Sequence, residues 1–98
     1  MNVTITEEGN KALVSLEGRL DTLTAPQLEA EVNGKLDGVK TLIFDFQNLA
    51  YVSSAGLRIL FMAQKIMNKQ GKMIVRNANA DIKDIFTVTG FSNILTIE

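Results

Sequence analysis

Two adjacent serines, Ser53 and Ser54, stand where an apolar segment gives way to a long helical pattern. The N-terminus of a helix carries backbone N–H groups without intrahelical partners and a partial positive charge. One interpretation is that a serine here only caps the helix, which is a common role. The other is that one hydroxyl accepts a phosphoryl group, because the helix end favours the resulting dianion. The spacing alone leaves both interpretations open.

Gly56 falls inside the first turn of the same helix, where glycine is normally disfavoured. We therefore expect a backbone or a partner to approach the helix closely at this point. Further along the helix, Arg58, Phe61 and Lys65 fall on the same side as Ser54 at 100° per residue.

The predicted helix also presents apolar side chains beside its polar side. Phe61 and Met62 border the stripe of polar residues, while Leu57 and Leu60 are expected to face the sheet. One interpretation is that Phe61 and Met62 are partly buried against a neighbouring helix. The other is that they form an apolar docking patch beside Ser54, since exposed aromatic and methionine side chains mark protein interfaces.

The composition excludes several kinds of chemistry. The 98 residues include no cysteine and no histidine, which excludes disulfides, thiolate nucleophiles, Ser-His-Asp triads and zinc sites built from cysteine or histidine. No activated nucleophile with a base can be assembled, so we expect no enzyme, no cofactor and no metal. Ten basic and eleven acidic residues do not suggest nucleic-acid binding.

No apolar run approaches the roughly 20 residues of a membrane span, and the N-terminal residues do not resemble a signal peptide. These features predict a cytoplasmic domain without direct membrane insertion.

The apolar periodicities predict one α/β domain over residues 1–98, with the order β-β-α-β-α-β-α and a last segment, 91–97, that is a short strand or an irregular tail. Strands are expected over 2–8, 12–17, 41–46 and 72–76, with a loop over 47–52. Helices are expected from a capping box at Thr24 to near Asp37, weakened at Gly34, and over 54–70 and 80–89. The first two strands form an antiparallel hairpin, and right-handed crossovers make the later strands parallel.

The segment Val52–Arg58 resembles the phosphorylation loop of the STAS domains, in particular the bacterial anti-sigma factor antagonists. The resemblance covers essentially the whole chain. Gly18–Asp21 is similar to the exit of that family's second strand, Leu42–Asp45 to its central strand, and Thr89–Phe91 to its final turn. The resemblance implies a mixed, mostly parallel sheet with an N-terminal β-hairpin and about three helices.

By position, Ser54 corresponds to the family's phosphorylated serine, two residues before Gly56. Many relatives carry aspartate just before that serine, whereas this chain carries Ser53, which makes Ser53 a rival acceptor. The resemblance also implies that Asp21 lies near this loop and matters for partner binding or phosphorylation; its other interpretation is an ordinary turn residue. Asp45 is predicted at the carboxyl end of a parallel strand, where it is either a polar residue near the ligand site or a loop-forming residue.

The resemblance implies a phosphorylation-controlled partner switch. The unphosphorylated chain would bind an anti-sigma factor that is itself a serine/threonine kinase of the histidine-kinase-like ATPase type, and so free a sigma factor for transcription. That kinase would phosphorylate Ser54, and a PP2C-type phosphatase would reset it. The expected partner-binding residues are Asp21, Ser53, Ala55, Gly56, Arg58, Phe61 and Met62.

Two alternatives remain. One is an unphosphorylated STAS accessory subunit of a membrane lipid-transport complex. The other is a receiver-type phosphoacceptor at Asp45, which fits poorly because Arg76 stands where that chemistry expects a lysine.

Overall fold

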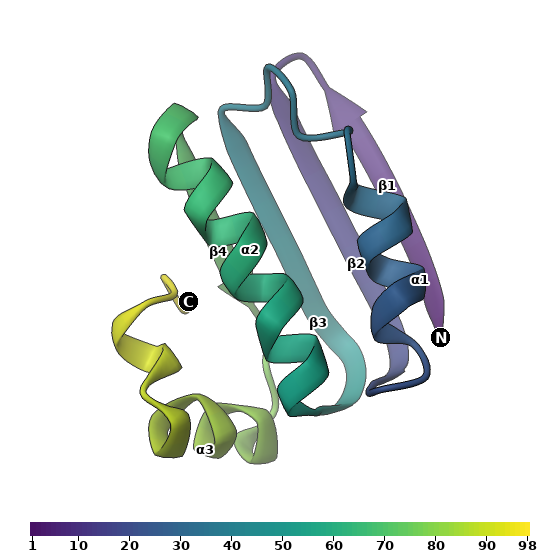
Figure 1. Cartoon of the computed structure of the whole chain (residues 1–98), viewed down its shortest axis with the longest axis vertical. Coiled ribbons are helices and arrows are strands. Elements are labelled where there is room, and N and C mark those ends of the chain that lie inside the picture. The colour runs from purple at the N-terminus through teal and green to yellow at the C-terminus, as the bar shows by residue number, and fades with distance from the viewer.

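The computed structural model describes all 98 residues and centres on a four-stranded sheet in the order β1-β2-β3-β4 (Figure 1). β1 (Asn2–Glu8) and β2 (Lys11–Leu20) form the predicted antiparallel hairpin. β3 (Thr41–Val52) runs parallel to β2, and β4 (Lys72–Arg76) runs parallel to β3. The predicted mixed, mostly parallel sheet is therefore confirmed.

Three helices and one short turn of 3-10 helix complete the domain. α1 (Ala25–Val32) connects β2 to β3, and α2 (Ser54–Gln70) connects β3 to β4. Figure 1 shows both helices in front of the same face of the sheet, with α3 (Ala80–Thr89) at one end of it. The 3-10 turn η1 (Phe91–Asn93) follows α3. None of the helices is both long enough and apolar enough to cross a membrane.

The hydrophobic core lies between the sheet and the helices, because alternate strand residues point to the same face. From β3, Leu42, Phe44 and Phe46 are fully buried, and α3 extends the core with Phe86, whose ring centroid lies 6.5 Å from that of Phe46. Ile43 is also buried but stands outside this core cluster. Its alternate neighbours Thr41 and Asp45 on β3 share the face of the sheet opposite to the core.

The predicted loop over residues 47–52 was wrong, because β3 continues to Val52. Its last residues pair with the end of β2, up to Leu20 opposite Val52, after two register shifts. Such bulges interrupt the alternation of polar and apolar residues. The exposed pair Gln47 and Asn48 therefore looked like loop sequence while lying within a strand.

The helix predicted from Thr24 to near Asp37 is shorter than expected. α1 ends at Val32, and Gly34 has a φ of +78°, a left-handed conformation that a helix cannot continue through. The predicted capping box is also absent, because the Thr24 side chain makes no cap hydrogen bond. Leu36 is buried as expected, but from the connecting loop.

The last helix matches its prediction. The Asn79 side chain accepts a hydrogen bond from Ile82 N at 2.8 Å, and Gly90 ends the helix with a φ of +82°. The C-terminal tail contains no strand beyond a single bridge between Val75 and Ile97.

Asp45 lies inside β3 rather than at its carboxyl end, so its predicted location was wrong. It pairs in register with Arg76 and lies on the face away from α1 and α2. Its Oδ1 accepts hydrogen bonds from Asn77 Nδ2 and Gln47 N, both at 3.0 Å, and its Oδ2 lies 3.7 Å from Arg76 Nη2. The hydrogen bond from Asn77, helped by Gln47 N–H and Arg76, holds the pKa of Asp45 below its ordinary value although desolvation opposes this. These contacts join β3 to the turn after β4.

Replacing Asp45 by asparagine keeps the shape of this contact and removes its charge. Because the carboxylate has a lowered pKa in the folded state, its stabilisation is present at neutral pH and is lost as the pH falls below about 4. We expect Asp45→Asn to lower the free energy of unfolding by about 1–2 kcal/mol at neutral pH. The gap from wild type should shrink at about pH 3.

Urea unfolding at the two pH values checks this, with exposed Glu29→Gln as the control that should differ little from wild type at either pH. A gap for Asp45→Asn that does not change with pH would contradict the account.

Candidate functional site

The junction between β3 and α2 presents the two serines in different ways. Ser53 is the N-cap residue of α2, with φ −93° and ψ 176°, and its side chain makes no cap hydrogen bond. Its hydroxyl oxygen is buried and has no hydrogen-bond partner. Ser54 is the first residue of α2 and is exposed. The cap hydrogen bond considered from the sequence is therefore not formed, and Ser54 is exposed while the Ser53 hydroxyl oxygen is buried.

The backbone of this junction is held by the end of β2. Ser53 N donates to Leu20 O at 2.8 Å, and Leu57 N donates to Ser53 O at 2.9 Å. The turn that follows Leu20 therefore lies directly beside the serine loop. This places Asp21 near the loop, as the resemblance implied.

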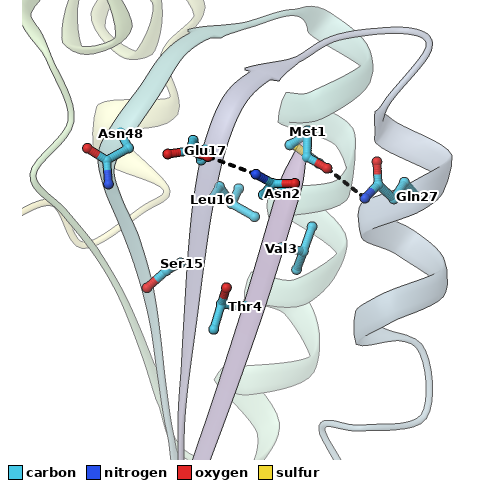
Figure 2. A pocket seen from close by; sticks show the side chains of 9 residues that line it. All are labelled: Met1, Asn2, Val3, Thr4, Ser15, Leu16, Glu17, Gln27 and Asn48. Carbon is cyan, nitrogen blue, oxygen red and sulfur yellow. Dashed lines mark hydrogen bonds between the residues drawn. The ribbon is translucent and has the colours of Figure 1, made fainter.

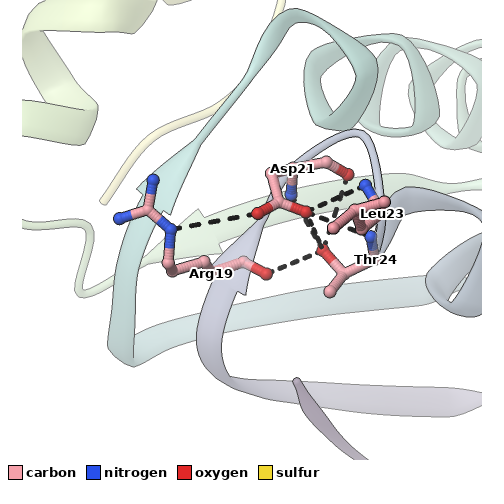
Figure 3. Close-up of polar contacts among 4 residues, drawn as sticks. All are labelled: Arg19, Asp21, Leu23 and Thr24. Carbon is pink, nitrogen blue, oxygen red and sulfur yellow. Dashed lines mark hydrogen bonds and ion pairs between the residues drawn. The ribbon is translucent and has the colours of Figure 1, made fainter.

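Asp21 organises the turn between β2 and α1 (Figure 3). Its Oδ1 accepts hydrogen bonds from Leu23 N at 3.0 Å and from Thr24 N at 3.1 Å, while Arg19 Nε lies 3.9 Å from Oδ2. The Thr24 hydroxyl donates to Arg19 O at 2.7 Å. Desolvation raises the pKa of Asp21, but these hydrogen bonds and the Arg19 charge together lower it below its ordinary value. The carboxylate thus fixes the turn as an Asx motif while staying partly exposed.

The close approach expected at Gly56 is confirmed, and the residue that approaches the helix there is Leu20. A Cβ added at Gly56 would lie 2.6 Å from Leu20 Cγ and 3.2 Å from Leu20 O. Gly56 is buried, and Ala55 is half-buried against the core, so both lie below the surface that Ser54 presents. Glycine at this position lets α2 begin directly against the end of β2.

Phe61 and Met62 occupy opposite flanks of α2, which the sequence did not reveal. The Phe61 ring is 40% exposed and packs edge-on against Phe91 of η1, with centroids 6.3 Å apart. Met62 is half-buried and lines a cavity between α1 and α2. Arg58 lies between them, exposed and without an ion pair. Each of these two apolar side chains is thus packed against a neighbouring element on one side and partly exposed to solvent on the other.

Three neighbours of the serine loop were not singled out from the sequence. The Arg19 guanidinium lies 4.5 Å from the ring centroid of Tyr51, and Leu23 is 88% exposed. Single exposed aliphatic side chains are common on protein surfaces, but Leu23 adds apolar area to the turn that lies beside the serine loop. The signal in the sequence was a lone leucine between the turn residues Asp21 and Thr24.

The remaining polar features lie elsewhere. The largest cavity, about 500 Å³, lies beside β1 and contains none of the predicted site residues (Figure 2). Four of its lining residues are joined in two hydrogen bonds, since Asn2 Nδ2 donates to Glu17 Oε1 at 2.8 Å and Gln27 Nε2 donates to Met1 O at 2.9 Å. Asp45, on the face of the sheet opposite to the core, is not part of the serine cluster. No group of three or more acidic residues is arranged to hold a metal ion.

Ser54 is exposed, and no neighbouring side chain is placed to activate its hydroxyl. The Ser54 hydroxyl forms no hydrogen bond to a carboxylate or to any other base. The first turn of α2 contains no acidic residue, so the partial positive charge of the helix end is not neutralised there. A phosphoryl group on Ser54 would be attracted by this partial positive charge.

A family model of the STAS domain matches residues 2–98. The chain belongs to the STAS domain family. This STAS domain is 29% identical, over 99% of its length and 85% of the relative's, to BtrV of Bordetella bronchiseptica, a candidate anti-sigma factor antagonist. It is 24% identical, over 99% of its length and 92% of the relative's, to the anti-sigma-B factor antagonist of Staphylococcus aureus.

The fold of this STAS domain is also similar to that of the Bacillus cell fate determinant SpoIIAA in its phosphorylated form. The TM-score is 0.76 at 18% identity, over 99% of this chain and 91% of that one. The predicted family and its fold are confirmed.

The contact between Gly56 and Leu20 gives a direct test of how the loop is built. We expect Gly56→Ala to destabilise the fold by about 1–3 kcal/mol, because the added methyl group overpacks against a fully buried leucine. Thermal or urea unfolding measures the loss. The double variant Gly56→Ala with Leu20→Ala should lose less than the sum of the two single changes, since the smaller side chain makes room. Additive losses would mean that the two residues do not press on each other.

Proposed function

We propose that this STAS domain is an anti-sigma factor antagonist that works as a phosphorylation-controlled partner switch, with Ser54 as the acceptor. The observation that carries the proposal is the contrast at the start of α2, where the Ser54 side chain is exposed and the Ser53 hydroxyl is buried. The names of the relatives support the antagonist role, and a protein of similar fold is known in a phosphorylated form.

Ser54 is the better acceptor because a kinase must bring its nucleotide in line with the attacking hydroxyl. The Ser53 hydroxyl is buried, and the Ser53 backbone is held by Leu20 O. Reaching Ser53 would require the loop to separate from β2. Ser54 requires no such opening.

In its unphosphorylated form the domain binds an anti-sigma factor that is also a serine/threonine kinase of the histidine-kinase-like ATPase type. The binding surface lies around Ser54: exposed Leu23 and partly exposed Asp21 are on one side, and exposed Arg58 and Phe61 and half-buried Met62 lie along α2. Buried Gly56 and half-buried Ala55 and Ser53 shape this surface from below. Capture of the anti-sigma factor frees a sigma factor in the cytoplasm.

Phosphorylation switches the surface and leaves the fold in place. The phosphate adds about −1.5 to −2 charges at a point that the partner must cover, and a desolvated anion without a partner disrupts a packed interface. Within the domain the same phosphate meets the unpaired N–H groups of the first turn of α2, where no acidic residue repels it. A PP2C-type phosphatase then restores the free hydroxyl.

The proposal predicts a single modified residue. After incubation with ATP and the cognate histidine-kinase-like ATPase, mass mapping should place one phosphate on Ser54. Ser53→Ala should still be phosphorylated, whereas Ser54→Ala should accept no phosphate and still bind the kinase. Because Ser54 is exposed and is not the N-cap residue, its loss should change stability by no more than about 0.5 kcal/mol.

Phosphate on Ser53 would overturn the choice of acceptor. An active cognate kinase that modifies neither serine would overturn the switch, and the domain would then be better explained as an unphosphorylated accessory subunit of a membrane transport complex.

A further inference from the structure

The outer side of α2 carries positive charge that nothing in the chain neutralises. Arg58, Lys65 and Lys69 all lie on its exposed side, and the helix contains no acidic residue. None of the three takes part in an ion pair, although Lys65 Nζ lies 5.6 Å from the Phe61 ring centroid. The chain as a whole has a net charge of −1, so positive charge is concentrated on this helix.

An apolar groove runs beside these cations, between α2 and the end of α1. We call it the α1–α2 groove: its apolar lining is Val32, Leu36, Met62, Ala63 and Ile66. Its cavity volume is about 270 Å³, and Ile66 is 40% exposed. A second hollow of about 280 Å³ shares Met62 and Ile66 and adds Lys65 and Lys69 at the rim. Asp37 lines the opposite side of the groove.

α3 has an exposed side of the complementary kind. At 100° per residue Asp81, Asp84, Ile85 and Val88 fall on one side of α3, which we call the α3 stripe, while Ile82 and Phe86 point into the core. Val88 is 85% exposed, and both carboxylates are exposed and without ion pairs. Lys83 lies on a different side of the helix.

We propose that the α3 stripe of one copy of this chain docks in the α1–α2 groove of another. Val88 enters the groove against Met62 and Ile66. Asp81 and Asp84, one helical turn apart, face Lys65 and Lys69, which are also one turn apart. The unpaired carboxylates and the unpaired lysines thereby form ion pairs, and the exposed apolar side chains of both surfaces are buried.

The two surfaces are different parts of the same molecule, so the contact is heterologous. Each bound copy keeps one free groove and one free stripe, and assembly continues beyond a dimer unless a ring closes. The α3 stripe spans a helix of only 10 residues, so the contact is smaller than a standard interface and its affinity is weak. The charges at its rim make it sensitive to salt.

Sedimentation velocity of the purified chain tests the proposal without any partner protein or phosphorylation. Between about 10 µM and about 1 mM protein at low salt, the mean mass should rise above the 10.8 kDa of one chain, and salt near 1 M should return it to that value. The groove variant Lys65→Glu/Lys69→Glu and the stripe variant Asp81→Lys/Asp84→Lys should each remain monomeric. Mixing the two should restore assembly, because the reversed groove then meets the reversed stripe.

Lys11→Glu/Lys72→Glu changes the net charge by the same amount as the groove variant at exposed residues outside the groove, so it should assemble like wild type. The proposal is overturned if the wild-type mass stays at one chain over the whole range. It is equally overturned if the control variant loses assembly as fully as the groove variant, or if the mixture stays monomeric. Circular dichroism confirms that each variant is folded.

Discussion

The contact between Leu20 and the start of α2 is the constraint on which the candidate site depends. The Leu20 carbonyl accepts a hydrogen bond from Ser53 N, while its side chain fills the space against Gly56. This contact determines which serine is buried and which is exposed. Because Leu20 also ends the strand that leads into the Asp21 turn, it brings the two loops of the site to the same end of the sheet (Figure 1).

The charges around the start of α2 determine how this end of the domain would respond to a phosphate on Ser54. The Asp21 carboxylate accepts hydrogen bonds from backbone N–H groups of its own turn. It therefore stabilises the turn and does not act as a base for Ser54. α2 has a basic outer side and no acidic residue in its first turn. A phosphate on Ser54 would therefore be tolerated by the domain and opposed by a partner that must bury it. In the proposed switch, this one covalent change would act on the interface more than on the fold.

The sequence predicted those structural features that depend on residues close together in the chain. The order of the elements, the Asn79 cap, the end of α3 at Gly90 and the close approach at Gly56 all follow from propensity, capping or the steric needs of glycine. The length of β3 did not, because the register shifts that extend it come from its pairing with β2 and leave no alternation to detect. α1 ended early for a more local reason: the backbone is extended at Asn33 and has a positive φ at Gly34, which the apolar spacing of Leu36 concealed.

At the site, the serine pair could be predicted from the sequence, but its two members could not be ranked by exposure, since burial of the Ser53 hydroxyl depends on the packing around it. It also missed Leu23 and the stacking of Arg19 on Tyr51, which join residues from two strands. Phe61 and Met62 are adjacent in sequence and were treated together. The structure separates them because η1 packs against one flank of α2 and α1 against the other.

The most direct test of the central claim compares the affinity of the anti-sigma kinase for two forms of the domain, one with serine and one with phosphoserine incorporated at position 54 during synthesis. Calorimetry without ATP measures both, so that the kinase cannot modify the first form. The account predicts that the phosphoserine form binds at least about 100-fold more weakly, which corresponds to about 2.7 kcal/mol, while its melting temperature stays close to that of the unmodified domain. Equal affinities for the two forms would contradict it.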